Sequence, residues 1–187
     1  MKRFVVGIDE VGRGPIAGPV TVGAVLLPLE QSEWRLWEGL KDSKKLSEKK
    51  RNEWYMHIKQ QSIACAVSFI SAHDIDVRGI AVAARDAARG ALDQLYADPS
   101  TAKVLLDWGL RVGAEWEQEQ FVKGDERFPV IALASIFAKV ERDTYMKKLA
   151  EKIPGYGFEQ HKGYGTTAHY AALAKMGPSR EHRTTFL

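Results

Sequence analysis

The sequence predicts a mixed α/β fold in one domain, and three observations lead to this prediction. The chain has 187 residues, which is within the usual length of a single domain. Its content of 45% hydrophobic and 27% charged residues is an ordinary globular balance. Short apolar runs rich in β-branched residues alternate with longer stretches whose apolar residues recur every three or four positions. We therefore expect one sheet with helices packed against it.

Five segments have the composition of β-strands. The first is apolar and ends at Asp9 and Glu10. A turn rich in glycine and proline follows at 11–19, so the second strand should pair antiparallel with the first. Most of the later strands are separated from one another by helical segments, which is typical of a mixed sheet. The expected strands are 4–8, 20–27, 63–70, 103–107 and 117–123.

Four segments have a helical pattern. Ser47 precedes the first of them and suits the N-cap position, because its hydroxyl can accept a free backbone N–H. The longest has an apolar face opposite a polar stripe formed by Ser135, Lys139 and Arg142. The expected helices are 48–60, 80–95, 130–151 and 166–176.

The composition excludes several classes of protein. A single cysteine, Cys65, rules out a disulfide framework, and its apolar neighbours favour a buried side chain. No segment approaches the ~20 apolar residues of a membrane-spanning helix, and the N-terminus lacks the layout of a signal peptide. We therefore expect a cytoplasmic protein with no membrane partner, and a monomer by default.

The net charge is small but unevenly distributed along the chain. The 27 basic and 24 acidic residues leave +3, which by itself is too little to indicate a polyanionic partner. Segment 41–51 alone holds six basic and two acidic residues, which suits contact with phosphates. The alternative is a solvated helix face around Lys49, Lys50 and Arg51.

Carboxylates stand where predicted strands end. Asp9 and Glu10 follow the first strand, Asp107 ends the fourth, and Asp125 lies in a loop before the longest helix. An acid directly after an apolar run is unusual for packing alone, because an unpaired buried carboxylate is costly. Acids that converge at one sheet edge repel one another, and Mg²⁺ or Mn²⁺ would relieve that repulsion. Taken singly, each acid could instead be a solvated turn residue.

Other candidate motifs are weaker. His161, His169 and His182 match no recognised zinc-ligand spacing, and we interpret them as surface residues or contacts to a polyanion. The glycine-rich turn lacks both the lysine of a P-loop and the spacing of a dinucleotide fingerprint. Gly12 and Gly14 suit either a tight turn or the close approach of a ligand, and the sequence leaves both interpretations open.

The same turn carries the most specific motif of the chain. Residues 7–20, Gly-Ile-Asp-Glu-Val-Gly-Arg-Gly-Pro-Ile-Ala-Gly-Pro-Val, closely resemble the N-terminal signature of ribonuclease HII, the type 2 ribonuclease H family. Further blocks resemble elements of that family, in the same order, over essentially the whole chain. These blocks are Lys-Asp-Ser-Lys-Lys-Leu at 41–46, Leu-Leu-Asp at 105–107, Lys-Gly-Asp at 123–125, Ala-Ser-Ile-Phe-Ala-Lys-Val-Glu-Arg-Asp at 134–143, His-Lys-Gly-Tyr at 161–164 and the stretch 180–186.

This resemblance implies a fold and an activity. The implied fold is ribonuclease-H-like, with a five-stranded mixed sheet flanked by helices and a small helical C-terminal part. One catalytic domain would span 1–187, with its core at 1–155 and a substrate-contacting segment at 156–187. The implied enzyme is an endonuclease that hydrolyses the RNA strand of RNA–DNA hybrids. It would also nick on the 5′ side of single ribonucleotides in duplex DNA, and so remove misincorporated ribonucleotides.

The matched motifs also imply the site residues. Asp9, Glu10, Asp107 and Asp125 correspond to the catalytic and metal-binding carboxylates of the family, which implies Mg²⁺ or Mn²⁺, with two ions during catalysis. The glycine-rich turn would grip the ribonucleotide and its 2′-hydroxyl, and a tyrosine would stack beside it. The expected substrate-binding residues are Gly12, Arg13, Gly14, Lys44, Ser135, Lys139 and Tyr164.

Alternative interpretations remain. A nuclease of the same fold restricted to long hybrids would share the carboxylates, whereas a non-catalytic hybrid-binding module would not need them. Ribonuclease HIII is less favoured, because that family carries an extra N-terminal domain and this sequence begins almost directly at its first strand. No peptide that would bind a replication clamp is evident at 180–187.

Overall fold

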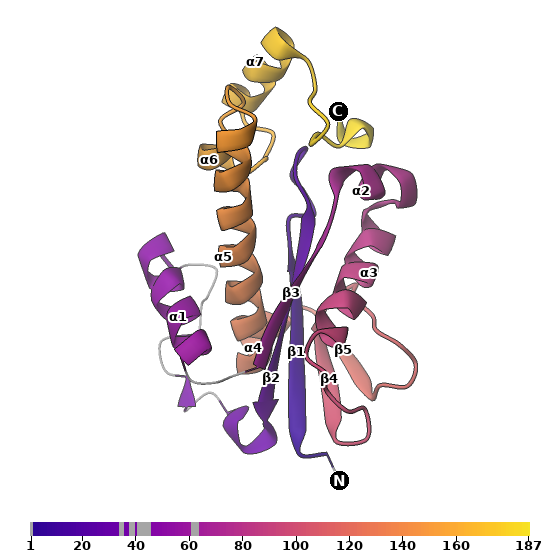
Figure 1. Ribbon diagram of the computed structural model, residues 1–187. Helices are drawn as coiled ribbons and strands as arrows, with labels where there is room; N and C mark the ends of the chain where they lie inside the picture. Colours follow the sequence, from indigo (N-terminus) through magenta and orange to yellow (C-terminus); the bar gives the residue numbers. More distant parts are fainter. Residues whose placement is uncertain (1, 34–35, 38–39, 41–45, 61–63) are drawn as a thin grey trace.

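A mixed five-stranded sheet forms the centre of the protein (Figure 1). The computed structural model describes residues 2–33, 36–37, 40, 46–60 and 64–187. The strand order is β3-β2-β1-β4-β5; β2 pairs antiparallel with β1 and β3, whereas β4 pairs parallel with β1 and β5. The strands are β1 (Phe4–Val11), β2 (Val20–Pro28), β3 (Ala64–Ile70), β4 (Ala102–Asp107) and β5 (Gln118–Phe121).

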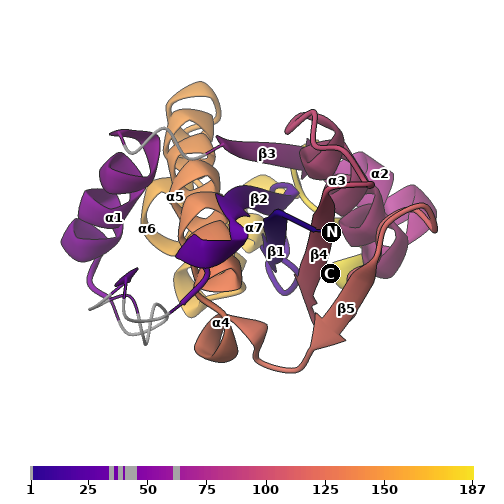
Figure 2. The ribbon, with the colours of Figure 1, turned by 90° about the horizontal axis from the view of Figure 1, so that it is seen from below.

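Helices cover both faces of the sheet, as Figure 2 shows in a view along it. On one face lies α3 (Ile80–Asp93), whose buried side is mainly alanine and therefore lets the helix pack close to the strands. On the other face lies α5 (Pro129–Lys152), which packs against β1 and β2. The outermost helix on that side is α1 (Glu48–Gln60), where Tyr55 stacks on Phe137 of α5 at a ring distance of 5.3 Å.

The approach of α5 to the sheet depends on glycine. A Cβ atom on Gly7 of β1 would lie 2.3 Å from the carbonyl carbon and oxygen of Val130. A Cβ atom on Gly23 of β2 would lie 2.5 Å from the carbonyl oxygen of Ala134. Since real side chains do not come so close to backbone atoms, only glycine allows this spacing. The contact places the N-terminal half of α5, and with it Ser135, beside the middle of β1.

The C-terminal part packs on the end of the molecule that lies above the sheet in Figure 1. Its helices are α6 (Phe158–His161) and α7 (Thr167–Met176). A third apolar cluster joins Phe158 and Tyr156 to Met146 of α5 and to Ala17 of the loop between β1 and β2. An isolated bridge pairs Ala17 with His182 near the C-terminus. This part is therefore built directly onto the glycine-rich loop.

The structure confirms the predicted fold class and nine predicted elements, with shifted ends. The first strand, whose apolar run was predicted to end at Asp9 and Glu10, continues through both acids to Val11, and the fifth strand is shorter than predicted. Three short helices were not predicted, because four to seven residues are too few to show a helical period: α2 (Ala72–Arg78), α4 (Gly124–Arg127) and α6. Asp125 therefore lies in α4 and not in a loop, and Cys65 is only half-buried.

The described helices include none that is long and apolar enough to cross a membrane.

Candidate active site

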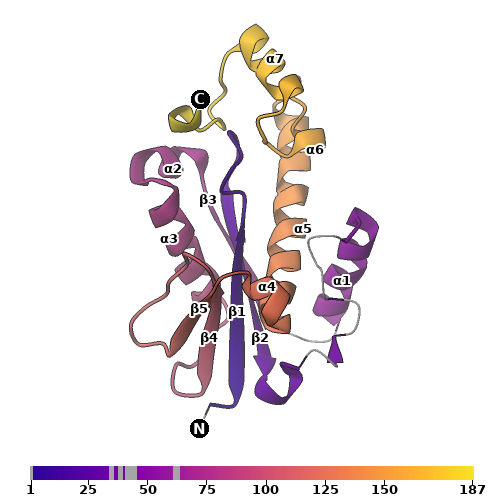
Figure 3. The same cartoon turned by 180° about the vertical axis from the view of Figure 1, so that it is seen from behind.

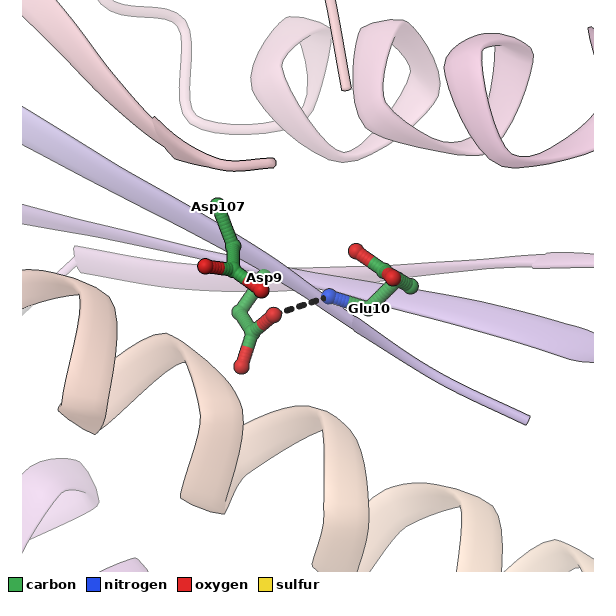
Figure 4. Close-up of side chains that lie close together, drawn as sticks. All are labelled: Asp9, Glu10 and Asp107. Carbon is green, nitrogen blue, oxygen red and sulfur yellow. Dashed lines mark hydrogen bonds between the residues drawn. The ribbon is translucent and has the colours of Figure 1, made fainter. Parts of the chain in front are cut away.

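Three carboxylates converge beside the central strand. Asp9 and Glu10 lie on β1, and Asp107 is the last residue of the neighbouring parallel strand β4. Each offers one oxygen such that the three oxygens lie within 4.8 Å of one another. Asp9 is 4% exposed, and Figure 4 shows the three side chains grouped above α5. Three carboxylates this close together, one buried and two half-buried, form a candidate metal site.

Strand pairing explains how adjacent residues can serve one site. Successive strand residues point to opposite faces, so Asp9 and Glu10 would normally diverge. β1 pairs with β2 as far as Val11, whereas its pairing with β4 stops at Ile8. The edge of β1 that faces β4 is therefore free at both acids, and Asp107 is placed next to it. The Oδ1 atom of Asp9 also accepts the Glu10 N–H at 2.8 Å, which orients the first carboxylate.

A backbone hydrogen bond places Asp125, the fourth acid, near Asp107, the third. The Oδ1 atom of Asp107 accepts the N–H of Gly124 at 2.9 Å, and Asp125 is the next residue. Asp125 is 2% exposed and lies outside the group of three, although its charge acts on Asp9. Figure 3 shows α4, which carries Asp125, beside the first turns of α5. The structure therefore brings three predicted carboxylates together and places the fourth nearby.

The electrostatics of this group favour a bound cation. Burial, followed by the charges of Glu10 and Asp107, raises the pKa of Asp9 well above its usual value, and the nearby Ser135 hydroxyl opposes this shift. Burial also raises the pKa of Glu10, against the charge of Arg13. One oxygen of Glu10 is buried without a hydrogen-bond partner among the described residues. An all-oxygen set with an unpartnered oxygen fits Mg²⁺ or Mn²⁺.

Asp9, Glu10 and Asp107 line a pocket of about 350 Å³. Three of the predicted substrate-binding residues, Ser135, Lys139 and Tyr164, line its walls. Arg51, on α1, also lines it and was not selected from the sequence. The only sequence signal for Arg51 was the basic segment 41–51, where a solvated helix face was an equal alternative. The pocket thus has carboxylates at one end, and the basic side chains of Arg51 and Lys139 and the exposed ring of Tyr164 elsewhere on its wall.

Three of the four remaining residues predicted to bind substrate lie in the described part of the chain. Arg13 lies near Glu10, with 3.5 Å between its Nη1 and Oε1 of the glutamate. Gly12 and Gly14 lie in the same loop, directly after β1. Lys44 lies outside the described residues.

The structure gives different roles to Gly12 and Gly14, for which the sequence left both a tight turn and a ligand contact open. Gly12 has φ +91°, and a Cβ atom at its position would lie 2.3 Å from Nε of Arg142. The fold therefore requires glycine at this position. Gly14 is exposed and has no such φ, and a Cβ atom at its position would have no neighbour within 4 Å. The fold therefore places no demand on Gly14, and its open surroundings leave room for a ligand.

The interpretation of two C-terminal histidines as surface residues was wrong. His169 and His182 are buried and hydrogen-bonded to each other, so they are not surface residues. Arg142, which the sequence places on the polar stripe of the longest helix, is fully buried, as is Arg183. The sequence around a single polar residue does not reveal whether the folded protein provides a buried hydrogen-bond partner for it.

Solved structures share this fold. Ribonuclease H2 of Pyrococcus horikoshii matches 97% of this chain and 93% of its own, with a TM-score of 0.78 and 26% identity. Ribonuclease HII of Archaeoglobus fulgidus, solved in a complex with PCNA, matches 98% and 95%, with a TM-score of 0.75 and 27% identity. The fold and the acidic site define the class: a nuclease with the ribonuclease-H-like fold.

The sequence comparisons narrow that class. The family model for ribonuclease HII matches residues 6–187. Ribonuclease HII of Bacillus licheniformis is 44% identical over 184 residues, which cover 98% of this chain and 69% of that protein. Ribonuclease HII of Prochlorococcus marinus is 44% identical over 190 residues, covering 100% and 98%. The chain belongs to the ribonuclease HII family and is an endoribonuclease that acts on RNA–DNA hybrids.

Proposed function

We propose that this enzyme nicks duplex DNA on the 5′ side of single embedded ribonucleotides, in addition to hydrolysing longer hybrids. The observation that carries the proposal is the open Gly14 position in a loop directly after the catalytic acids. The 2′-hydroxyl distinguishes a ribonucleotide from its neighbours in DNA, and a glycine lets the protein backbone approach that hydroxyl closely. The physiological role would be removal of misincorporated ribonucleotides.

The carboxylates would hold two Mg²⁺ or Mn²⁺ ions. Asp9, a buried acid on the central strand β1, would be shared, with Glu10 and Asp107 on one ion and Asp125 on the other. Such ions supply charge stabilisation to the phosphate and lower the pKa of the attacking water. The reaction would form a bond from the water oxygen to phosphorus and break the bond to the 3′-oxygen. The products would be 5′-phosphate and 3′-hydroxyl ends.

Residues outside the acidic group would hold the substrate. Lys139 lies beside Asp143 at 2.7 Å and reaches the pocket wall, where its charge can contact a phosphate. Ser135 would orient Asp9, and Lys44 would contact the nucleic-acid backbone. The ring of Tyr164 is 43% exposed at the pocket, which suits stacking on a sugar or base. Segment 156–187 would therefore contact substrate within a single catalytic domain.

One assay tests this function directly. The protein is incubated with a DNA duplex that carries one ribonucleotide, in the presence of Mg²⁺ or Mn²⁺ and then with EDTA. We expect one nick, 5′ of the ribonucleotide, which EDTA abolishes. A uniform RNA–DNA hybrid serves as the control substrate. Cleavage of the hybrid alone would show that the enzyme is restricted to long hybrids.

Gly14→Ala should separate recognition from folding. We expect kcat/KM for the single ribonucleotide to fall at least about tenfold, since a misplacement of about 1 Å costs that much or more. Thermal unfolding should be almost unchanged, because the new methyl group meets no neighbour. Gly12→Ala is the contrast, and should lower both stability and activity. Normal cleavage by Gly14→Ala would show that the loop does not approach the substrate closely.

A further inference from the structure

Arg142 holds the glycine-rich loop, residues 12–19, from the side of α5. Its Nε donates to the carbonyl of Pro19 at 3.0 Å and its Nη2 to that of Ala17 at 3.3 Å. Its Nη1 donates to the carbonyl of Lys162 at 2.9 Å, two residues before Tyr164. One fully buried guanidinium thus joins the loop to the turn that carries the tyrosine.

Arg183 holds the same loop from the C-terminal side. Its Nε donates to the carbonyl of Gly18 at 3.0 Å. Its Nη1 and Nη2 donate to the carbonyls of Arg13 at 3.0 Å and Gly12 at 2.6 Å. The bonds to Gly12 and Arg13 fix the backbone of the very residues expected to contact the ribonucleotide.

Neither guanidinium forms a salt bridge in the described part of the chain, although the charge of Asp143 acts on Arg142 and that of Asp76 on Arg183 from further away. No carboxylate among the described residues lies within 4.0 Å of Arg142 or Arg183. Burial, together with the charge of Arg142, lowers the pKa of Arg183 to about 9, so it stays charged at neutral pH. Burying two like charges without a direct salt bridge is costly. We therefore expect Arg142 and Arg183 to have a role beyond packing.

The arginines also set which groups the loop presents. They occupy carbonyls of the loop, whereas the N–H groups of Arg13 and Gly14 donate no hydrogen bond to any residue in the described part of the chain. A run of free N–H groups backed by positive charge is suited to bind an anion such as a phosphate.

A chain of hydrogen bonds continues from the neighbour of Arg183 to Tyr164. The N–H of Ser179 donates to Nδ1 of His182 at 2.9 Å, so the hydrogen of this neutral ring is on Nε2. Nε2 of His182 then donates to Nε2 of His169 at 3.0 Å. Nδ1 of His169 donates in turn to the carbonyl of Tyr164 at 2.9 Å. Adjacent residues, His182 and Arg183, thus hold both expected substrate-contacting elements.

We propose that Arg142, Arg183, His169 and His182 are positioning residues that hold the glycine-rich loop and Tyr164 at one fixed spacing. This inference rests on the proposed function, in which both elements contact the ribonucleotide. A lone ribonucleotide can be bound in only one position along the duplex, so the spacing between the loop and Tyr164 must match it. A uniform hybrid offers a ribonucleotide at every position and tolerates a displaced loop.

A double-mutant cycle tests the histidine part. His182→Asn keeps an oxygen near the position of Nδ1, for the Ser179 N–H, but has no atom at Nε2. We expect it to lower kcat/KM for a lone ribonucleotide about tenfold in the wild-type background. In the Tyr164→Ala background it should have less than about a twofold effect, because it acts through the tyrosine. Additive losses in the two backgrounds would overturn the proposal.

Arg183→Lys tests the arginine part. Lysine keeps the charge but cannot span three carbonyls. We expect the ratio of kcat/KM for a lone ribonucleotide to that for a uniform hybrid to fall about tenfold, with unchanged Mn²⁺ binding measured by calorimetry. The matched control is Arg85→Lys, an exposed arginine on α3. Arg142→Lys provides an independent test if the first variant does not fold.

The outcomes distinguish this inference from the proposed function. Equal losses on both substrates would show that the arginines only stabilise the fold, and would overturn the inference. A wild-type enzyme that cleaves hybrid but not a lone ribonucleotide would instead contradict the proposed function. A wild-type nick with an unchanged substrate ratio in Arg183→Lys and Arg142→Lys would overturn the inference alone.

Discussion

Asp9→Asn is expected to lower the rate of RNA hydrolysis at least about 10³-fold. A metal ion supplies several kcal/mol of stabilisation to the transition state, and each 1.4 kcal/mol corresponds to about a tenfold change in rate. Asparagine keeps the shape of Asp9, including an oxygen that can accept the Glu10 N–H, but removes the charge. Substrate binding, measured in EDTA by fluorescence anisotropy, should be preserved.

The same substitution should stabilise the metal-free protein. The pKa of Asp9 is raised in the folded state, so the acid contributes most favourably when protonated at low pH. That contribution is lost as the pH rises from the unfolded pKa through the folded one. At neutral pH, Asp9→Asn should therefore raise the free energy of unfolding by about 1 kcal/mol.

Added Mn²⁺ provides the complementary measurement. It should raise the Tm of the wild type, because a ligand that binds only the folded state stabilises it, but should raise that of Asp9→Asn much less. Asp93→Asn, at an exposed acid on α3, is the matched control and should behave as the wild type. Full hydrolytic activity in Asp9→Asn, or an equal response to Mn²⁺, would remove Asp9 from the site.

Gly7→Ala should produce the largest loss of stability. The new Cβ atom would lie 2.3 Å from backbone atoms of Val130, which no change of rotamer can relieve. The central strand and α5 must therefore separate, and we expect a loss of at least about 3 kcal/mol. Activity should fall with it, because Ser135 and the acids are positioned by the same contact.

Urea unfolding followed by circular dichroism checks this expectation. Gly14→Ala is the matched control: the same chemical change in the same chain should shift the free energy of unfolding by less than about 0.5 kcal/mol. A Gly7→Ala midpoint equal to that of the wild type would mean that β1 and α5 are further apart than the structure shows.

The acids of the candidate site could be selected from the sequence because their chemistry conflicts with their position. A carboxylate directly after an apolar run is costly if it is buried, which made each acid a candidate, and the resemblance to ribonuclease HII implied the set of four. The sequence could not show how Asp9 and Glu10 share one site. That depends on β1 leaving β4 at Ile8 while remaining paired with β2, and on a register between distant strands.

The buried polar residues were missed for a related reason. His169, His182, Arg142 and Arg183 are polar residues in an amphipathic or loop context, where exposure is the usual state. The histidines bond to each other, and the arginines bond mainly to backbone carbonyls of the distant glycine-rich loop. A carbonyl is present in every residue, so no pattern of side chains identifies it as a partner.

The sequence by itself determined which segments along the chain form the strands and main helices, that the fold is mixed α/β, and which carboxylates are candidates, because periodicity and the position of an acid after an apolar run can be read locally. The tertiary structure decided which glycine serves the fold and which leaves room for a ligand, since that depends on what lies opposite each one. It also decided that Arg51 lines the pocket and that two arginines lie behind the glycine-rich loop. These facts arise only when segments far apart in the chain are brought into contact.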